Sequence, residues 1–163
     1  MALDAKLLRD SFDLIVERAP NLTERFYDIL FERHPQTRGM FQRNGRKQQE
    51  QMLTAALAGV LDHLDDVPWL SSQLGALGRR HEGYGVTREM YAWVGGALLA
   101  TLEEVAGPDW SPALETAWTD AYAVIVSLMT TPAPAPRAAP GADHGRPAAA
   151  STSSCFASTA SVA

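Results

Sequence analysis

The sequence predicts an all-α fold, and three observations carry that prediction. Apolar residues recur at spacings of three and four along most of residues 1–131, which is the period of an amphipathic helix. No segment shows the sustained alternation of apolar and polar residues that is typical of a half-buried strand. Capping residues, prolines and glycines separate the periodic stretches. We expect six substantial helices with a short element after the second, an order that does not suit an up-and-down four-helix bundle.

The first two helices are predicted from their caps. Asp4 can cap a first helix, which carries the first apolar stripe. Asn21 and Glu24 have the spacing of a capping box, and this box would open the second helix. Pro35 ends that helix, because the residue before a proline is pushed out of the helical region. Residues 35–40 then form a short turn or a single helical turn.

Four more helices follow the same logic. A long apolar stripe predicts a helix over about residues 46–64, and Pro68 starts the next one. Thr87 can cap a fifth long helix. Ser111 precedes a proline, which is the usual pairing of a cap with the first helical position, and it opens a last helix that runs to about Thr131.

Length and composition limit the possible functions. The chain has 163 residues and a formal net charge of −5, which suits one ordinary domain and argues against a nucleic-acid binder. Its single cysteine, Cys155, excludes a disulfide framework and a cysteine-based zinc site. The N-terminus has no apolar signal region, and no run reaches transmembrane length. We therefore expect a soluble, cytoplasmic protein.

Composition changes sharply at Pro132. Half of the 10 prolines fall in residues 132–163, and large apolar side chains almost vanish there. A stretch of this kind buries too little surface to offset the entropy of ordering it. The sequence therefore predicts a folded domain over residues 1–131 and a disordered tail rich in Pro, Ala and Ser over residues 132–163.

One histidine occupies an unusual position. His81 continues the apolar stripe of Leu70, Leu74 and Leu77 at spacings of four, three and four. A neutral imidazole on such a face is either a hydrogen-bonded core residue or a ligand of haem iron, and the pattern leaves both readings open. The chain has no Cys-x-x-Cys-His box, so haem would be held without a covalent bond. The other histidines suit surface, cap or tail positions: His34, His63 and His144.

Three segments together resemble a known family. They are residues 22–35, Met40 with Phe41, and residues 77–86, which read Leu-Gly-Arg-Arg-His-Glu-Gly-Tyr-Gly-Val. The sequence resembles the globins, and specifically the single-domain bacterial haemoglobins, the globin domain of flavohaemoglobins and the neuroglobin-like bacterial globins. The resemblance covers about residues 3–131. It implies a globin fold packed around a haem pocket.

The resemblance also implies roles for individual residues. His81 would be the proximal iron ligand, and Phe41 would wedge against the haem, although an ordinary core aromatic would look the same. Tyr27 and Gln49 fall where these globins place distal hydrogen-bond donors. Gln48 is the neighbour that competes with Gln49 for this role, and a solvated glutamine is the alternative for either one. The remaining residues that would pack against the haem are Leu53, Leu77, Val86, Tyr91 and Val94.

The proximal side departs from the family pattern. Tyr91 lies ten residues after His81, where flavohaemoglobin-like proteins place a tyrosine of a His–Tyr–Glu network. The matching glutamate position, eleven residues after Tyr122, is Ala133. The network is therefore predicted to be incomplete, which weakens the case for a peroxidase. Arg79 or Arg80 could pair with a haem propionate, and solvated arginines are an equal alternative.

The resemblance implies a haem-b globin that binds O₂, and also NO and CO, reversibly and with high affinity. The alternative is a nitric oxide dioxygenase that depends on a separate reductase, because no flavin or nicotinamide domain fits in this chain. A third reading is a haem-free globin-fold module that docks other proteins. The set of His81, Phe41, Tyr27 and Gln49 argues against that third reading.

Overall fold

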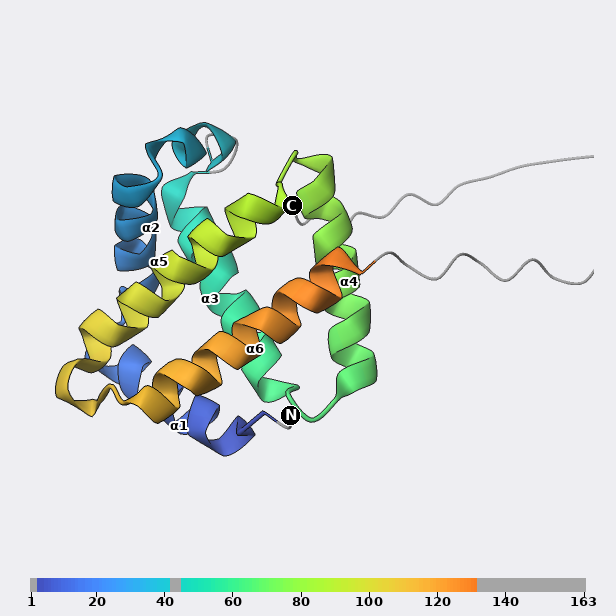
Figure 1. Cartoon of the computed structure of the whole chain (residues 1–163). Helices are drawn as coiled ribbons and strands as arrows, with labels where there is room; N and C mark the ends of the chain where they lie inside the picture. Colours follow the sequence, from blue (N-terminus) through green and yellow to red (C-terminus); the bar gives the residue numbers. More distant parts are fainter. Residues whose placement is uncertain (1–2, 42–44, 132–163) are drawn as a thin grey trace, which may run out of the picture. The chain divides into compact units, whose positions relative to one another are not determined.

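A computed structural model describes residues 3–41 and 45–131 of the chain (Figure 1). This described part is helical and contains no strand, so the predicted all-α fold is confirmed for it. The predicted tail, residues 132–163, lies outside the described residues. The elements in chain order are α1 (Ala5–Arg18), α2 (Leu22–Arg33), the 3₁₀ helix η1 (Pro35–Phe41), α3 (Arg46–Asp62), α4 (Val67–Gly83), α5 (Arg88–Ala106), the 3₁₀ helix η2 (Gly107–Asp109) and α6 (Pro112–Thr130).

Two of the four predicted caps are formed and two are not. The Asp4 carboxylate accepts a hydrogen bond from the Leu7 N–H at 2.9 Å, and the Ser111 hydroxyl accepts one from the Leu114 N–H at 3.3 Å. Thr87 stands at the N-terminus of α5 but makes no side-chain cap bond. Asn21 makes none either. Instead, its main-chain carbonyl accepts from the Glu24 N–H at 3.0 Å, so the predicted capping box is absent.

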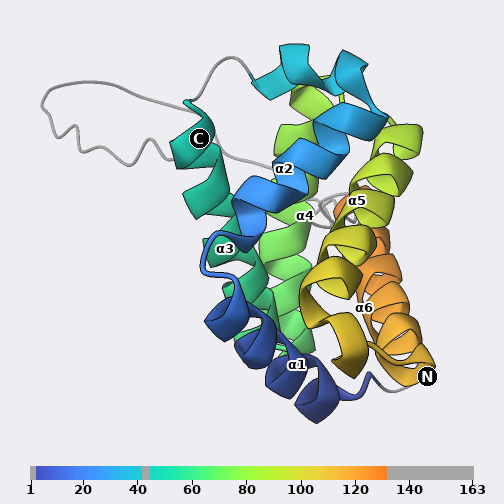
Figure 2. The same cartoon turned by 90° about the vertical axis from the view of Figure 1, so that its left-hand side faces the viewer.

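The core is built mainly from α1, α2, α5 and α6. α2 packs against α5, and α1 crosses the lower end of the helices to contact α5 and α6 (Figure 2). Leu8, Ile15, Leu30 and Leu102 are fully buried there. α3 packs against α2 and α1, whereas α4 packs along α6 and makes little backbone contact with α3. The fold therefore keeps α3 and α4 apart.

Two glycines permit unusually close contacts of α6 with other helices. A Cβ on Gly78 of α4 would lie 1.8 Å from the Met129 carbonyl oxygen of α6. A Cβ on Gly95 of α5 would lie 2.5 Å from the Tyr122 ring. Both distances are far shorter than van der Waals contact. The positions of α4 and α5 on α6 thus depend on the absence of side chains at these two sites.

Within the described ranges, we find no helix that combines the length and the apolar character needed to cross a bilayer.

Candidate functional site

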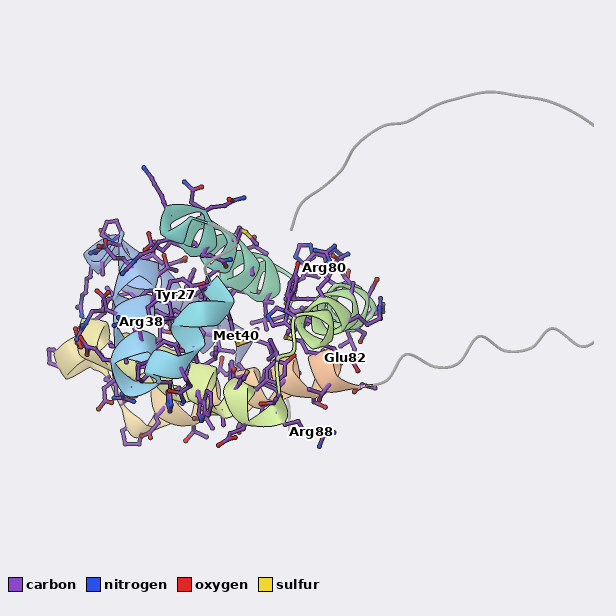
Figure 3. The ribbon with its side chains drawn as sticks, turned by 90° about the horizontal axis from the view of Figure 1, so that it is seen from above. Tyr27, Arg38, Met40, Arg80, Glu82 and Arg88 are labelled. Atoms are coloured by element: carbon purple, nitrogen blue, oxygen red, sulfur yellow. The ribbon has the colours of Figure 1, made fainter. Side chains whose placement is uncertain are left out.

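A large apolar cavity opens where α3 and α4 diverge. Its volume is about 180 Å³, counted as the space open to the centre of a water-sized sphere, and it is partly open to solvent. In Figure 3, the lining residue Met40 lies on η1, on the opposite side of the gap from α4, which carries Arg80. The lining residues come from α2, η1, α3, α4, α5 and α6: Phe26, Leu30, Thr37, Met40, Phe41, Leu53, Ala56, Leu57, Val60, Leu74, Leu77, His81, Val86, Met90, Tyr91, Val94, Leu98, Tyr122, Ile125, Val126 and Met129.

His81 supplies the one imidazole among these lining residues. It lies in the last turn of α4, and its Nδ1 is 2.9 Å from the carbonyl oxygen of Leu77. A neutral imidazole donates through the nitrogen that faces a carbonyl, so Nε2 is the nitrogen left to accept or to ligate. Burial lowers the pKa of His81, and the bond to Leu77 opposes this effect. The ring is therefore neutral at pH 7, the form that binds metals.

Two tyrosines stand behind this histidine. The Tyr91 ring lies 6.2 Å from the His81 ring, centroid to centroid, with an angle of 22° between their planes. The Tyr122 hydroxyl donates to the main-chain carbonyl of Tyr91 at 2.7 Å. Burial raises the pKa of both tyrosines, so they stay neutral at pH 7. The glutamate position of the predicted network, residue 133, lies outside the described residues.

Seven of the nine predicted site residues lie on the cavity wall. Two of them belong to α4, one belongs to the connection after α4, and the others belong to η1, α3 and α5. The seven are Phe41, Leu53, Leu77, His81, Val86, Tyr91 and Val94.

Tyr27 and Gln49 are not on that wall. Tyr27 is only 5% exposed, and its ring packs edge-on against Phe41 at a centroid distance of 5.3 Å. Its hydroxyl makes no hydrogen bond to another residue in the described part of the chain, and burial raises its pKa to about 12. Gln49 is partly buried in the first turn of α3, whereas Gln48 is exposed. Tyr27 thus stands behind the lining residue Phe41, and Gln49 lies one turn before the lining residue Leu53 on α3.

Sequence reasoning missed the contribution of α6 to the cavity. Ile125, Val126 and Met129 line it, and so do Met40 and Met90. The signal for α6 was present, because Tyr122, Ile125 and Met129 share one stripe of that helix. The stripe alone indicated a buried face and did not show that the face borders a cavity.

The other described histidines serve neighbouring aromatic rings. His34 stacks on Trp93, and His63 stacks on Trp69 with ring centroids 3.7 Å apart. Neither histidine lines the cavity. In the part of the chain that the structure describes, no group of three or more His, Cys, Asp or Glu side chains is arranged to hold a metal ion. His81 is therefore the donor on which a metal-containing group would depend.

These residues fit a haem group. Haem needs a deep apolar slot with a neutral imidazole on one side, and the cavity has apolar walls on both α3 and α4 with His81 in place. The Leu77 carbonyl fixes the imidazole tautomer, which is the usual outer contact of a ligating histidine. Fold and site together define an all-helical protein built around an apolar pocket with one neutral histidine on its wall.

The comparisons with known proteins identify the family. The family model named Globin matches residues 24–129, and the chain belongs to the globin family. The flavohemoprotein of Bacillus anthracis is 32% identical over 127 residues, which is 76% of this chain and 31% of that protein. The flavohemoprotein of Vibrio cholerae is 30% identical over 127 residues, 76% of this chain and 32% of its own length. The chain therefore spans about a third of these curated relatives.

Solved structures agree with this assignment. A bacterial globin from Campylobacter jejuni superimposes with a TM-score of 0.65 at 26% identity, covering 77% of this chain and 90% of its own. An engineered carbene transferase, made from a nitric oxide dioxygenase candidate of Rhodothermus marinus, superimposes with a TM-score of 0.68 at 27% identity. That match covers 77% of this chain and 87% of the other.

Proposed function

We propose that this globin holds haem b non-covalently through His81 and reversibly binds O₂ and other diatomic ligands with high affinity. The observation that carries the proposal is the neutral His81 ring, whose Nε2 is left for a ligand in an apolar cavity. When bound, haem supplies an iron atom that takes diatomic gases. The protein's part is to orient the imidazole through the Leu77 carbonyl and to exclude water with apolar walls.

The distal side supports high affinity. The Tyr27 ring packs against the lining residue Phe41, and Gln49 lies one helical turn before the lining residue Leu53 on α3. We expect a side-chain movement to bring either donor to the ligand. A hydrogen bond to a polarised ligand contributes roughly 1–3 kcal/mol, which slows its release by about ten- to a hundredfold. We therefore expect slow O₂ dissociation.

Absorption spectra test this proposal. We expect a Soret band in the purified protein, changes in it on reduction and on exposure to CO and O₂, and its loss in His81→Ala. His63→Ala is a matched control, because His63 also has Nδ1 2.9 Å from the carbonyl four residues before it but lies outside the cavity. Absence of a Soret band after haem supplementation, or equal loss in both variants, would overturn the proposal.

A second candidate function is nitric oxide dioxygenase, in which NO, O₂ and one electron give nitrate. The structural likeness to the Rhodothermus marinus protein and the identity to flavohemoproteins favour it. Repeated turnover requires an electron donor, which we propose is a separate reductase. Sustained NO consumption in the presence of such a reductase, rather than one equivalent per haem, would separate this enzyme from a simple O₂ binder.

A further inference from the structure

Arg46, the first residue of α3, ties that helix to α2. Its Nη2 donates to the Asp28 carboxylate at 2.7 Å and to the Glu24 carbonyl at 3.1 Å. Its Nε donates to the Glu50 carboxylate at 2.9 Å. Three acceptors on two helices fix the orientation of the planar guanidinium, which a lysine could not reproduce.

The two acids that Arg46 binds adjoin the two predicted distal donors. Asp28 follows Tyr27 on α2, and Glu50 follows Gln49 on α3. The charge of Glu50 also adds to burial in raising the pKa of Tyr27. A single guanidinium thus links the backbone segments that carry both donors.

Apart from the bonds of Arg46, few polar side-chain contacts join α2 and α3 in the described part of the chain. One other side-chain hydrogen bond joins the two helices in the described part of the chain, from the Thr54 hydroxyl to the Thr23 hydroxyl at 3.3 Å. Arg46 makes the one ion pair between them among the described residues. The first turn of α3 therefore depends on Arg46 for its polar attachment to α2.

We propose that Arg46 is a positioning residue for ligand affinity. Its bonds to Asp28 and Glu50 hold the first turn of α3 against α2, so that Gln49 and Tyr27 approach the ligand from one corner of the cavity. This inference rests on the proposed haem function and on the distal roles of those two residues. Arg46 itself is not among the residues that line the cavity.

The effect of Arg46 should differ between two ligands. Bound O₂ is strongly polarised and gains much from a hydrogen-bond donor, whereas bound CO is weakly polar and gains little. A general loosening of the cavity would alter the release of both gases. The ratio of the O₂ and CO dissociation rates therefore distinguishes donor positioning from structural damage.

The experiment uses the full chain loaded with haem. In Arg46→Ala we expect O₂ dissociation to be roughly three- to tenfold faster, part of the ten- to hundredfold that a complete donor contributes. We expect CO dissociation to stay within about twofold of the wild-type value. Amide hydrogen exchange should also become faster in the first turn of α3, a readout that does not depend on ligand binding.

The matched control is Arg25→Ala. Arg25 lies on α2 and, like Arg46, pairs with a carboxylate on a neighbouring helix: its Nε and Nη2 lie 2.7 and 2.8 Å from the two carboxylate oxygens of Glu104 on α5. Its side chain is 38% exposed, close to the 46% of Arg46. Because this pair joins α2 to the helix on its other side, O₂ dissociation should be unchanged in Arg25→Ala. If Arg46→Ala does not accumulate as folded protein, Arg46→Lys is measured by the same ratio, with a smaller shift expected.

Several results would overturn the inference. One is equal acceleration of O₂ and CO release in Arg46→Ala, and another is unchanged O₂ release in a folded Arg46 variant. If Tyr27→Phe still speeds O₂ release, either result overturns the inference and leaves the proposed function intact. Unchanged O₂ release in both Tyr27→Phe and Gln49→Leu would remove the distal roles and the inference with them. Absence of haem binding would overturn the proposed function as well.

Discussion

The main-chain carbonyl of Met129 on α6 lies directly against Gly78 of α4, so that a Cβ at residue 78 would stand 1.8 Å from the carbonyl oxygen. Gly78 is buried, and it precedes His81 by three residues on the same helix. α6 is the main packing partner of α4. The close approach at this glycine therefore sets the position of His81 in the cavity.

Gly78→Ala should push α4 away from α6, because the obstacle is backbone and cannot rotate aside. We expect the free energy of unfolding to fall by about 1–3 kcal/mol, the usual cost of overpacking. The displaced His81 should also hold haem less tightly. Urea unfolding and the rate of haem transfer to an acceptor protein measure the two effects.

Gly75→Ala is the control on the same helix. The nearest atom to its new Cβ would be a guanidinium nitrogen of Arg79 at 3.7 Å, an ordinary contact. Alanine is favoured over glycine in a helix by roughly 0.5–1 kcal/mol, so this variant should be slightly more stable than the wild type. Equal destabilisation by both substitutions would contradict the role assigned to Gly78.

Tyr122→Phe removes the hydroxyl that donates to the Tyr91 carbonyl at 2.7 Å. We expect a loss of about 1 kcal/mol in unfolding free energy, the net value of one hydrogen bond. The Tyr91 ring faces His81, so the ferrous Soret maximum of the haem-loaded variant should shift as well. Tyr84→Phe, at a residue that is 51% exposed, should change neither quantity. A Soret maximum identical to the wild type would refute the link from Tyr122 to the histidine.

Ser11→Ala tests a buried polar contact in the core. The Trp118 indole N–H donates to the Ser11 hydroxyl at 3.1 Å, and that hydroxyl donates to the Leu8 carbonyl at 3.0 Å. Alanine leaves the indole N–H buried without a partner, at a cost of about 1–3 kcal/mol. Thermal and urea unfolding should show this loss, whereas Ser72→Ala on the exposed side of α4 should have no comparable effect.

Local signals explain why the helices were predictable. Asp4 and Ser111 cap their helices as expected because a cap needs only a nearby side chain and a suitable backbone. Asn21 shows the limit of that reasoning. Its ψ of 25° departs from the extended backbone that turns a cap side chain toward the helix, and no sequence pattern reveals this angle.

The site was predictable only in part. An apolar stripe shows which face of a helix is buried, but it does not show what that face is buried against. The spacing on one helix singled out His81, the resemblance supplied the site roles of His81 and Leu77, and both residues line the cavity. Met129 was missed as a lining residue, because its place there depends on how α6 packs against α4. Tyr27 stands behind the wall because the Phe41 ring lies against it, a contact between segments that the sequence did not position.

The buried Tyr27 phenol should make stability depend on alkaline pH. Burial, aided by the charge of Glu50, raises its pKa from 10.0 to about 12. The unfolded chain ionises first, so the contribution of Tyr27 is fully present below pH 10 and is lost as the pH rises from 10 through 12. The expected loss is about 2 kcal/mol at the upper end. Urea unfolding between pH 9 and pH 11.5 should therefore show a steeper decline in the wild type than in Tyr27→Phe. Tyr122 is present in both proteins, so the difference isolates Tyr27, and parallel curves would show that its phenol is not held in its neutral form by the fold.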